Sequence, residues 1–427
     1  MEKILFPSSE KWQKACQRPE IGKKKLNNIV NSVLREVKEN RDKALFQYTL
    51  EFDGIKLDQL KVSEEEIKTA NDSISIGLKN AIELAKRNIE KFHKSQSQID
   101  PEVETIKGVR CWRKSVPIDK VGIYIPGGTA PLFSTILMLG IPATIAGCNE
   151  IIMCSPPGKN GKLHPAILFT ASILGISNIY KVGGAQAIAA MAYGTETIPQ
   201  VYKIFGPGNQ YVTKAKALIQ QEGVSIDMPA GPSEVLIIAD QTSNPAFVAA
   251  DLLSQAEHGA DSQVILISDN ESVIDATLLE LDEQIKVLPR KEIAEEALRN
   301  SKAIVLNNNI ECIEFSNQYA PEHLIISTDN ASEYVNLVTN AGSVFLGHYS
   351  CESAGDYASG TNHTLPTNGY AKSYSGVSLD SFVKKITFQE LNKEGIKNIG
   401  EAIEIMADAE ELFAHKNAVT IRLNSLK

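Results

Sequence analysis

The spacing of apolar residues predicts two long amphipathic helices in the first hundred residues. Within Ile21–Gln47, apolar side chains recur three and four positions apart, as one face of a helix requires. These residues are Leu26, Ile29, Val30, Val33, Leu34 and Val37. Ser63 and Glu66 have the spacing of a capping box, which predicts the start of a second long helix. The apolar stripe of that helix comprises Leu78, Ile82, Ala85, Ile89 and Phe92.

Shorter apolar runs predict strands in the rest of the chain. Val103–Trp112, interrupted at Gly108, is typical of a β-hairpin. Strands then alternate with helices in the stretches 121–128, 150–158, 178–194 and 201–220, and Glu234–Asp240 closes this run. From Asn244 the alternation restarts, with strands expected at 263–268, 303–306, 323–327 and 343–347. Such alternation indicates parallel sheets covered by helices on both faces.

The pattern divides the chain into four regions. Residues 1–24 form an N-terminal segment, and 25–118 together with 240–376 form one α/β domain. Residues 119–239 form a second α/β domain inserted into the first, and 377–427 form a C-terminal tail that is helical from Ile396 onward. Gly355–Gly376 is rich in Gly, Ser, Thr and Asn. A loop of that length inside a compact domain is more often functional than idle.

Composition narrows the class of protein. The net charge of -9 leaves no excess of Lys or Arg to meet nucleic-acid phosphates or an anionic membrane. Pro131–Gly147 is the longest apolar-rich stretch, but Ser134, Thr135 and Pro142 interrupt it, so we expect a buried helix rather than a membrane span. The N-terminus lacks the regions of a signal peptide. The six cysteines include no CxxC pair, which fits a reducing cytoplasm.

Three glycine turns follow apolar strands and precede helices. They are Pro126–Gly128, Gly183–Gly184 and Gly206–Gly208. Such turns bind anions when glycine lets a phosphate approach the N–H groups of a helix N-terminus, and in a parallel sheet they would gather at the carboxyl edge. The chain has neither a complete GxGxxG nor a GxxxxGK[ST] motif, so P-loop phosphoryl transfer is disfavoured. The alternative is that they are tight loops of any α/β protein.

Four of the seven histidines lie near other polar residues. His258 follows Gln255 by three positions, His363 follows Asp356 by seven, and His415 follows Glu410 by five. Imidazole, carboxylate and amide groups suit Zn²⁺ or a similar divalent ion. Spacing alone leaves a structural role open for each of them.

His323 directly follows Glu322, just where a strand is expected to begin. A carboxylate and an imidazole beside one substrate could perform two different proton transfers. The alternative is a polar pair at the start of an exposed edge strand.

Several motifs, taken in order along the chain, resemble the histidinol dehydrogenase family. They are VGIYIPGG, VGGAQAIAA, KIFGPGN, AGPSEVL, DLLSQAEHG, APEHL, GDYASGTNHTLPT and AHKNAV. The resemblance extends over nearly the whole chain. It implies an α/β fold with two incomplete, Rossmann-like and aldehyde-dehydrogenase-like parallel-sheet domains, a helical N-terminal segment and a helical C-terminal tail. It also implies oxidation of L-histidinol through L-histidinaldehyde to L-histidine, in which two NAD⁺ are reduced in turn. Each subunit would bind one zinc ion.

The resemblance also assigns residues. It implies that Glu322 and His323 are catalytic, His323 taking the alcohol proton and Glu322 activating water for the aldehyde step. The implied zinc ligands, which would hold the substrate rather than ionise a water, are Gln255, His258, Asp356 and His415. Other substrate contacts would be Ser233, His363 and Glu410, and contacts to NAD⁺ in the 119–239 domain would be Tyr124, Gln186 and Asn209. His415 would come from the partner subunit, so the tail would be exchanged in a homodimer.

Other functions remain open at this point. A zinc hydrolase would use Glu322 as the base for a metal-activated water. An NAD-dependent dehydrogenase of another amino alcohol and a non-catalytic nucleotide-binding module are further alternatives. A thiol route through a thiohemiacetal would need an activated cysteine. The candidates, Cys111, Cys148, Cys154, Cys312 and Cys351, have no accompanying histidine motif, so we expect them to be structural.

Overall fold

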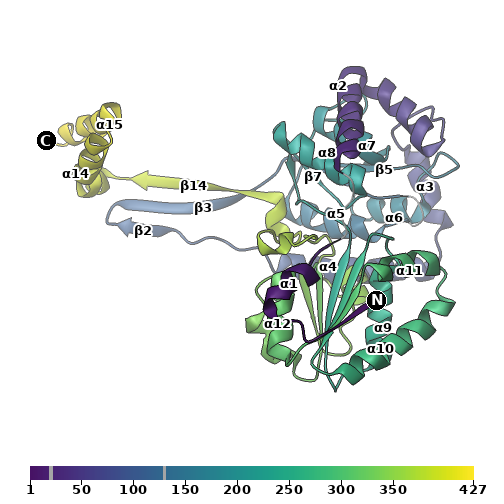
Figure 1. Cartoon of the computed structure of the whole chain (residues 1–427). Helices are drawn as coiled ribbons and strands as arrows, with labels where there is room; N and C mark the ends of the chain where they lie inside the picture. The colour runs from purple at the N-terminus through teal and green to yellow at the C-terminus, as the bar shows by residue number, and fades with distance from the viewer. Residues whose placement is uncertain (19–22, 128–130) are drawn as a thin grey trace.

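The computed structural model describes residues 1–18, 23–127 and 131–427. Two parallel sheets with their helices form a body, from which an antiparallel arm extends and carries two helices at its far end (Figure 1). The predicted start of the first helix at Ile21 and the turn residue Gly128 lie outside the described residues. Within the described ranges, no helix combines the length and apolar character needed to cross a membrane.

The larger sheet of the body contains six parallel strands. Their order is β1 (Glu2–Leu5), β11 (Lys302–Val305), β10 (Gln263–Ser268), β9 (Glu234–Ala239), β12 (His323–Ser327) and β13 (Ser343–Leu346). One face packs on α1 (Ser9–Ala15) and α12 (Asn309–Tyr319). The other packs on α9 (Pro245–Ala256), α10 (Glu271–Gln284) and α11 (Lys291–Arg299). All residues of β9 and β10 are buried, as expected for strands covered on both sides.

The smaller sheet of the body contains five parallel strands. Their order is β6 (Asn178–Lys181), β5 (Glu150–Ser155), β4 (Lys120–Tyr124), β7 (Lys203–Phe205) and β8 (Ser225–Ile226). One face packs on α2 (Lys23–Asp53), α7 (Gly184–Tyr193) and α8 (Gln210–Gln221). The other face is covered by α5 (Ser134–Ala146) and α6 (Pro165–Ser172), with α3 (Glu64–Ser73) and α4 (Ile76–Lys94) outside them.

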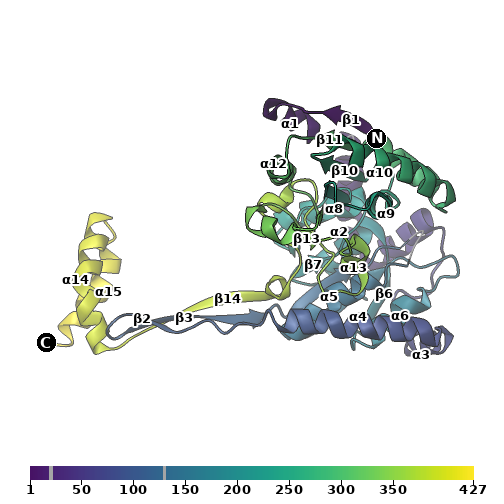
Figure 2. The same ribbon diagram turned by 90° about the horizontal axis from the view of Figure 1, so that it is seen from below.

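The arm is a three-stranded antiparallel sheet in the order β14 (Val383–Leu391), β3 (Val109–Pro117) and β2 (Val103–Ile106). The predicted hairpin about Gly108 is therefore confirmed. The tail helices, α14 (Lys393–Ala409) and α15 (Phe413–Asn424), pack on each other beyond the end of the arm (Figure 2). Their helical conformation agrees with the prediction for the tail.

Short elements complete the described chain. They are α13 (Glu352–Tyr357) and the 3₁₀ turns η1 (Ile285–Val287), η2 (Ala331–Leu337), η3 (Tyr370–Lys372) and η4 (Leu379–Phe382). Much of the predicted long loop within 355–376 is indeed irregular, although its first residues belong to α13. The predicted buried helix in 131–147 is α5, whose first ten residues are all buried.

The structure divides the chain differently from the sequence-based prediction. β9 does not close the 119–239 unit but lies between β10 and β12 in the six-stranded sheet. The N-terminal helices α2, α3 and α4 pack on helices of the five-stranded sheet, whereas we expected them in the domain with 240–376. A continuously apolar strand suits the centre of either sheet, and an amphipathic stripe does not say which sheet it covers. Pattern alone therefore could not decide these assignments.

The second predicted helix is in fact two helices. The capping box at Ser63 and Glu66 is present and starts α3. That helix ends at Ser73, Ile74 is extended, and the Ser75 hydroxyl caps the start of α4 by accepting the Leu78 N–H. A second serine cap therefore interrupts the predicted long helix.

Candidate active site

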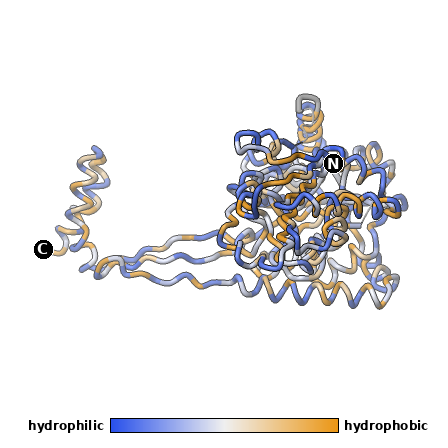
Figure 3. The backbone as a smooth tube through the Cα atoms, turned by 60° about the horizontal axis from the view of Figure 1, so that its bottom comes forward, coloured by the Kyte–Doolittle hydropathy of each residue, from blue (hydrophilic) through white to orange (hydrophobic). Residues whose placement is uncertain are grey.

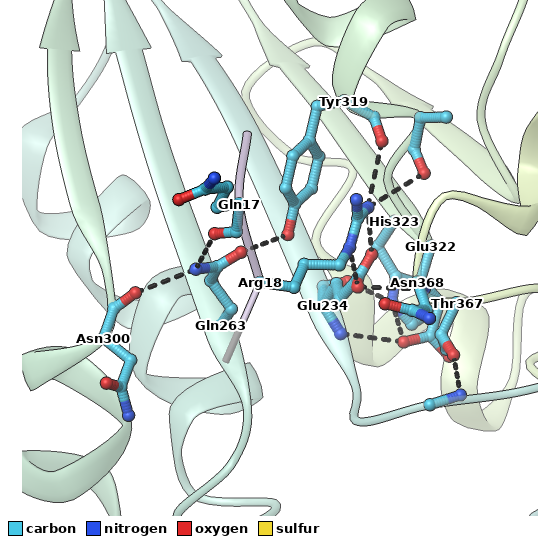
Figure 4. Close-up of polar contacts among 12 residues, drawn as sticks. Gln17, Arg18, Glu234, Gln263, Asn300, Tyr319, Glu322, His323, Thr367 and Asn368 are labelled. Atoms are coloured by element: carbon cyan, nitrogen blue, oxygen red, sulfur yellow. Dashed lines mark hydrogen bonds and ion pairs between the residues drawn. The ribbon is translucent and has the colours of Figure 1, made fainter. Parts of the chain in front are cut away.

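Glu322 and His323 lie at the amino end of the six-stranded sheet, where β12 begins beside β9. The Glu322 carboxylate Oε2 accepts the backbone N–H of Glu234 at 2.9 Å, and His323 Nδ1 lies 3.2 Å from the Glu234 carbonyl oxygen (Figure 4). Both side chains are buried. β12 has β9 and β13 as neighbours, so it is not an edge strand. The alternative of a polar pair at the start of an exposed edge strand is therefore excluded.

A second cluster faces His323 from α13 and the end of α9. Ligand atoms of His258, Glu352 and Asp356 all lie within 4.8 Å of one another. His323 Nε2 is 3.7 Å from Asp356 Oδ1, and His323 Nδ1 is 3.9 Å from Glu352 Oε1. The Gln255 side-chain nitrogen lies 3.1 Å from His258 Nδ1, so these two residues are neighbours as the spacing predicted.

The polar atoms of this cluster fit a bound cation. Gln255 Oε1, His323 Nε2 and both carboxylate oxygens of Glu352 are buried and have no hydrogen-bond partner among the described residues. Buried polar atoms normally have a hydrogen-bond partner. Four such atoms without one, gathered in a single cluster, therefore indicate a binding site for a ligand or an ion. Nitrogen and oxygen ligands of this kind suit Zn²⁺ or a similar divalent metal.

Glu352 was missed by the reasoning from sequence. It precedes Asp356 by four positions on α13, so the two carboxylates share one helix face. That spacing was the available signal, but it was overlooked because α13 runs across the predicted start of the loop at Gly355, where no helix was expected. Glu352 is 1% exposed, and an acidic residue is rarely buried to that extent without a partner.

His363 links this site to α5, a helix that packs on the five-stranded sheet. His363 Nδ1 lies 2.9 Å from the Asp356 carbonyl oxygen, and Nε2 lies 3.3 Å from Thr135 Oγ1 at the start of α5. Because α5 follows β4, the carboxyl edge of the smaller sheet faces the amino edge of the larger one. Ser233, half-buried, directly precedes β9 at the same edge.

Two of the glycine turns gather at the carboxyl edge of the five-stranded sheet, as predicted. The Tyr124 hydroxyl at the end of β4 accepts the Gly184 N–H at 3.1 Å. Gly206 has φ +128°, and a Cβ there would lie 2.2 Å from the Tyr124 carbonyl oxygen, so glycine is required. Tyr124 and Gln186 are buried here, whereas Asn209 is exposed and caps α8.

Burial shifts the pKa values of the two catalytic candidates in opposite directions. It raises the pKa of the Glu322 carboxyl well above its ordinary value and lowers the pKa of the His323 imidazole to about 3. It also lowers the pKa of His363 to about 4 and raises the pKa of Asp356 to about 7. Opposite shifts in adjacent groups are typical of acid–base sites. A bound divalent cation would oppose the shifts of the carboxyl groups that it contacts.

The structure does not bring Glu410 and His415 to this cluster within one chain. Both are exposed, Glu410 just after α14 and His415 on α15, at the far end of the arm (Figure 1). The other ten predicted site residues lie at the facing edges of the two sheets. The tail residues can therefore complete the site only from elsewhere, such as a second copy of the chain.

The cysteines show little sign of activation as nucleophiles. Burial raises the pKa of the Cys16 and Cys148 thiols to about 11, and raises the pKa values of Cys154 and Cys312 further. A raised pKa disfavours the reactive thiolate. Cys111 lies on the arm, and Cys351 immediately precedes α13.

The fold and the site together define an α/β enzyme with an acid–base pair beside a set of metal-ligand side chains. The structure resembles that of an acetylating aldehyde dehydrogenase from Geobacillus thermoglucosidasius with a TM-score of 0.50 at 14% identity, covering 88% of this chain and 93% of the other. That likeness concerns the fold alone and confirms the expected fold class.

The family model for histidinol dehydrogenase matches residues 16–423. The histidinol dehydrogenase of Bacteroides thetaiotaomicron is 59% identical over the full length of both chains, and that of Escherichia coli is 51% identical over 98% of this chain and 96% of the relative. The crystal structure of histidinol dehydrogenase from Elizabethkingia anophelis has a TM-score of 0.98 at 59% identity, covering 100% of this chain and 98% of the other. The chain belongs to the histidinol dehydrogenase family and is an oxidoreductase.

Proposed function

We propose that the protein oxidises L-histidinol through L-histidinaldehyde to L-histidine, with NAD⁺ as the oxidant and zinc as the bound metal. Membership of the family supports the substrate. The observation that carries the mechanism is the juxtaposition of Glu322 and His323 with the His258, Glu352 and Asp356 cluster. When bound, NAD⁺ accepts a hydride in each oxidation, and zinc orients the imidazole and amine of the substrate.

His323 is the base of the alcohol step. Its Nδ1 faces the Glu234 carbonyl oxygen, which selects the tautomer with the proton on Nδ1. The unpaired Nε2 is therefore the atom that accepts the alcohol proton. Fixing the ring in this way lowers the orientational cost of proton transfer.

Glu322 is the base of the aldehyde step. Its Oε2 is held by the Glu234 N–H, which leaves the other carboxylate oxygen to activate a water. Because Glu322 and His323 are adjacent, the two proton transfers occur at one substrate position.

Zinc would be held by Gln255, His258, Asp356 and His415. The first three lie in the body, and the unpaired Gln255 Oε1 supports an amide ligand. Glu352 lies close enough to be an additional or alternative ligand. His363 and Ser233 would contact the substrate, and Tyr124, Gln186 and Asn209 would contact NAD⁺.

His415 and Glu410 would reach the site from the partner subunit of a homodimer. Their exposure at the end of the arm supports this assignment. Each of the two sites would then combine the body of one subunit with the tail helices of the other.

The test is an assay of NADH and histidine formation with L-histidinol, before and after removal of the metal by a chelator. We expect two NADH per histidine, loss of activity with the chelator, and recovery when zinc is restored. His348→Gln is a matched control because His348 bonds Ser327 and Asp329 away from the site. Turnover without NADH would favour a hydrolase, and preference for a different amino alcohol would redirect the substrate assignment.

A further inference from the structure

Glu234 connects the two catalytic candidates through its backbone. Its N–H donates to Glu322 Oε2, and its carbonyl oxygen faces His323 Nδ1 (Figure 4). Both interactions depend on the exact position of one peptide segment at the amino end of β9. Glu234 is 1% exposed, so its carboxylate must find its partners inside the protein.

The Glu234 carboxylate is held by residues from two other segments. Arg18 donates to it through both Nε and Nη2, the second hydrogen bond being 2.9 Å long. The Asn368 N–H donates to Glu234 Oε1 at 2.9 Å. A bidentate pair between a guanidinium and a carboxylate fixes direction as well as distance. The N-terminal segment and the loop near Asn368 are thereby joined to β9.

Arg18 also binds the turn that leads into Glu322. Its Nη2 donates to the carbonyl oxygens of Tyr319 at 2.9 Å and Ala320 at 3.4 Å. Its guanidinium lies 3.9 Å from the centre of the Tyr319 ring. Ala320 has φ +56°, the left-handed conformation that ends α12 two residues before Glu322. Arg18 thus satisfies carbonyl groups that a helix end leaves unpaired.

We propose that Arg18 and Glu234 are positioning residues for the Glu322–His323 pair. Arg18 acts on this pair from two directions, through the backbone of Glu234 on the neighbouring strand and through the turn at Tyr319 and Ala320. The proposal rests on the catalytic roles assigned to Glu322 and His323 above. Neither Arg18 nor Glu234 needs to touch the substrate.

The buried ion pair between Arg18 and Glu234 makes the position of the Glu234 segment sensitive to the loss of either side chain. Removing one member of a buried pair leaves the other charge uncompensated, so the segment that carries it has to move or admit water. Such a movement at Glu234 would displace the acceptor of His323 Nδ1–H and the donor to Glu322 together. A misplacement of about 1 Å can cost about 10²-fold in rate.

The experiment compares Arg18→Met, Arg18→Lys and Glu234→Gln with the wild-type enzyme. We expect Arg18→Met and Glu234→Gln to lower kcat of both oxidation steps by about 10²-fold, with a much smaller change in KM. Arg18→Lys should recover part of kcat because lysine keeps the charge but not the bidentate geometry. Zinc content should remain at the wild-type level.

Lys302→Met is the matched control. Lys302 Nζ donates to the Ala15 carbonyl oxygen, so it also holds the N-terminal segment but does not touch Glu234. We expect this variant to keep wild-type kcat. An equal loss of kcat in Lys302→Met, or wild-type kcat in folded Arg18→Met and Glu234→Gln, would overturn the proposal. If Arg18→Met does not fold, Arg18→Lys and Glu234→Gln decide the question by the same criterion.

A second readout does not depend on turnover. ¹⁵N NMR of the histidine rings reports which nitrogen of His323 carries the proton, and His323→Gln identifies its signals. We expect protonation at Nδ1 in the wild type and a mixture of tautomers in Glu234→Gln. An unchanged tautomer in that variant would contradict the proposal even if the substrate differs. Failure of the wild type to oxidise L-histidinol would contradict the proposed function instead.

Discussion

The body and the arm bury their apolar side chains to very different extents. Every residue of β9 and β10 in the body is buried, whereas no residue of β14 in the arm is buried. The arm and the tail helices also expose large apolar side chains. They include Ile386, Phe388, Ile405, Met406, Leu412, Phe413 and Ile421. Figure 3 colours the hydrophobic stretches of both parts orange.

The proposed site is divided between these two regions. The body can build its part of the site alone, because Glu322, His323, His258 and Asp356 are positioned by packed strands and helices. The arm instead presents Glu410 and His415 on helices whose apolar side chains remain exposed in a single chain. Clustered exposed apolar residues commonly mark a protein interface. A second copy would cover them and bring the tail residues to its partner's body.

Removal of a proposed zinc ligand should have the largest effect, whichever region supplies it. His258→Ala in the body and His415→Ala in the tail should each lose bound zinc and reduce kcat/KM on the order of 10³-fold, since the substrate loses its orientation. Metal analysis and NADH assays measure both. Full zinc content in either variant would remove that residue from the ligand set, and His348→Gln should match the wild type.

A smaller effect is expected when one catalytic group of the body is changed and the metal ligands are kept. Glu322→Gln should lower aldehyde oxidation by about 10²–10³-fold and alcohol oxidation far less, because only the second step needs an activated water. Separate assays starting from L-histidinol and from L-histidinaldehyde measure this difference. Equal losses in both assays would show that Glu322 serves both steps.

The smallest expected effect concerns acid stability of the body. Burial lowers the pKa of His93, whose Nδ1 faces the Ile89 carbonyl oxygen and whose Nε2 faces the Asn362 amide nitrogen. The unfolded chain binds a proton at higher pH than the folded one, so stability falls as pH decreases below about 6.5 toward the lower folded pKa.

Chemical unfolding at pH 7 and pH 5 tests this interpretation. His93→Gln should reduce the loss of unfolding free energy between the two pH values, because glutamine does not titrate. An identical pH dependence in wild type and variant would exclude His93 as a contributor. His348→Gln provides the comparison at a histidine that lies beside the exposed Asp329.

Local signals in the sequence predicted local structure well. The Ser63–Glu66 capping box and the hairpin about Gly108 depend on neighbouring residues, and both were found. The assignment of β9 and the N-terminal helices to a sheet was wrong because it depends on contacts between distant segments. The break at Ile74 was missed because Ile74 lies four residues before Leu78 and so fits the spacing of the predicted apolar stripe.

The candidate site shows the same contrast. The Gln255–His258 contact and the Glu322–His323 pair follow from short spacings that a sequence displays directly. Local spacing made Asp356, His363 and His415 candidates, but their roles rested on family resemblance, because no spacing links them to Gln255 and His258. Glu352 and Arg18 were missed, because burial of a carboxylate and a contact across more than two hundred residues become visible only in the fold.

The most direct test of a shared site is complementation between a body variant and a tail variant. His258→Ala and His415→Ala subunits, each inactive alone, are co-expressed or dissociated and reassembled in equal amounts. A mixed dimer would contain one site made from two unaltered halves, so random assembly should restore about a quarter of wild-type activity. If the mixture, with mixed dimers demonstrated, stays as inactive as its two components, each tail serves its own body and the account is contradicted.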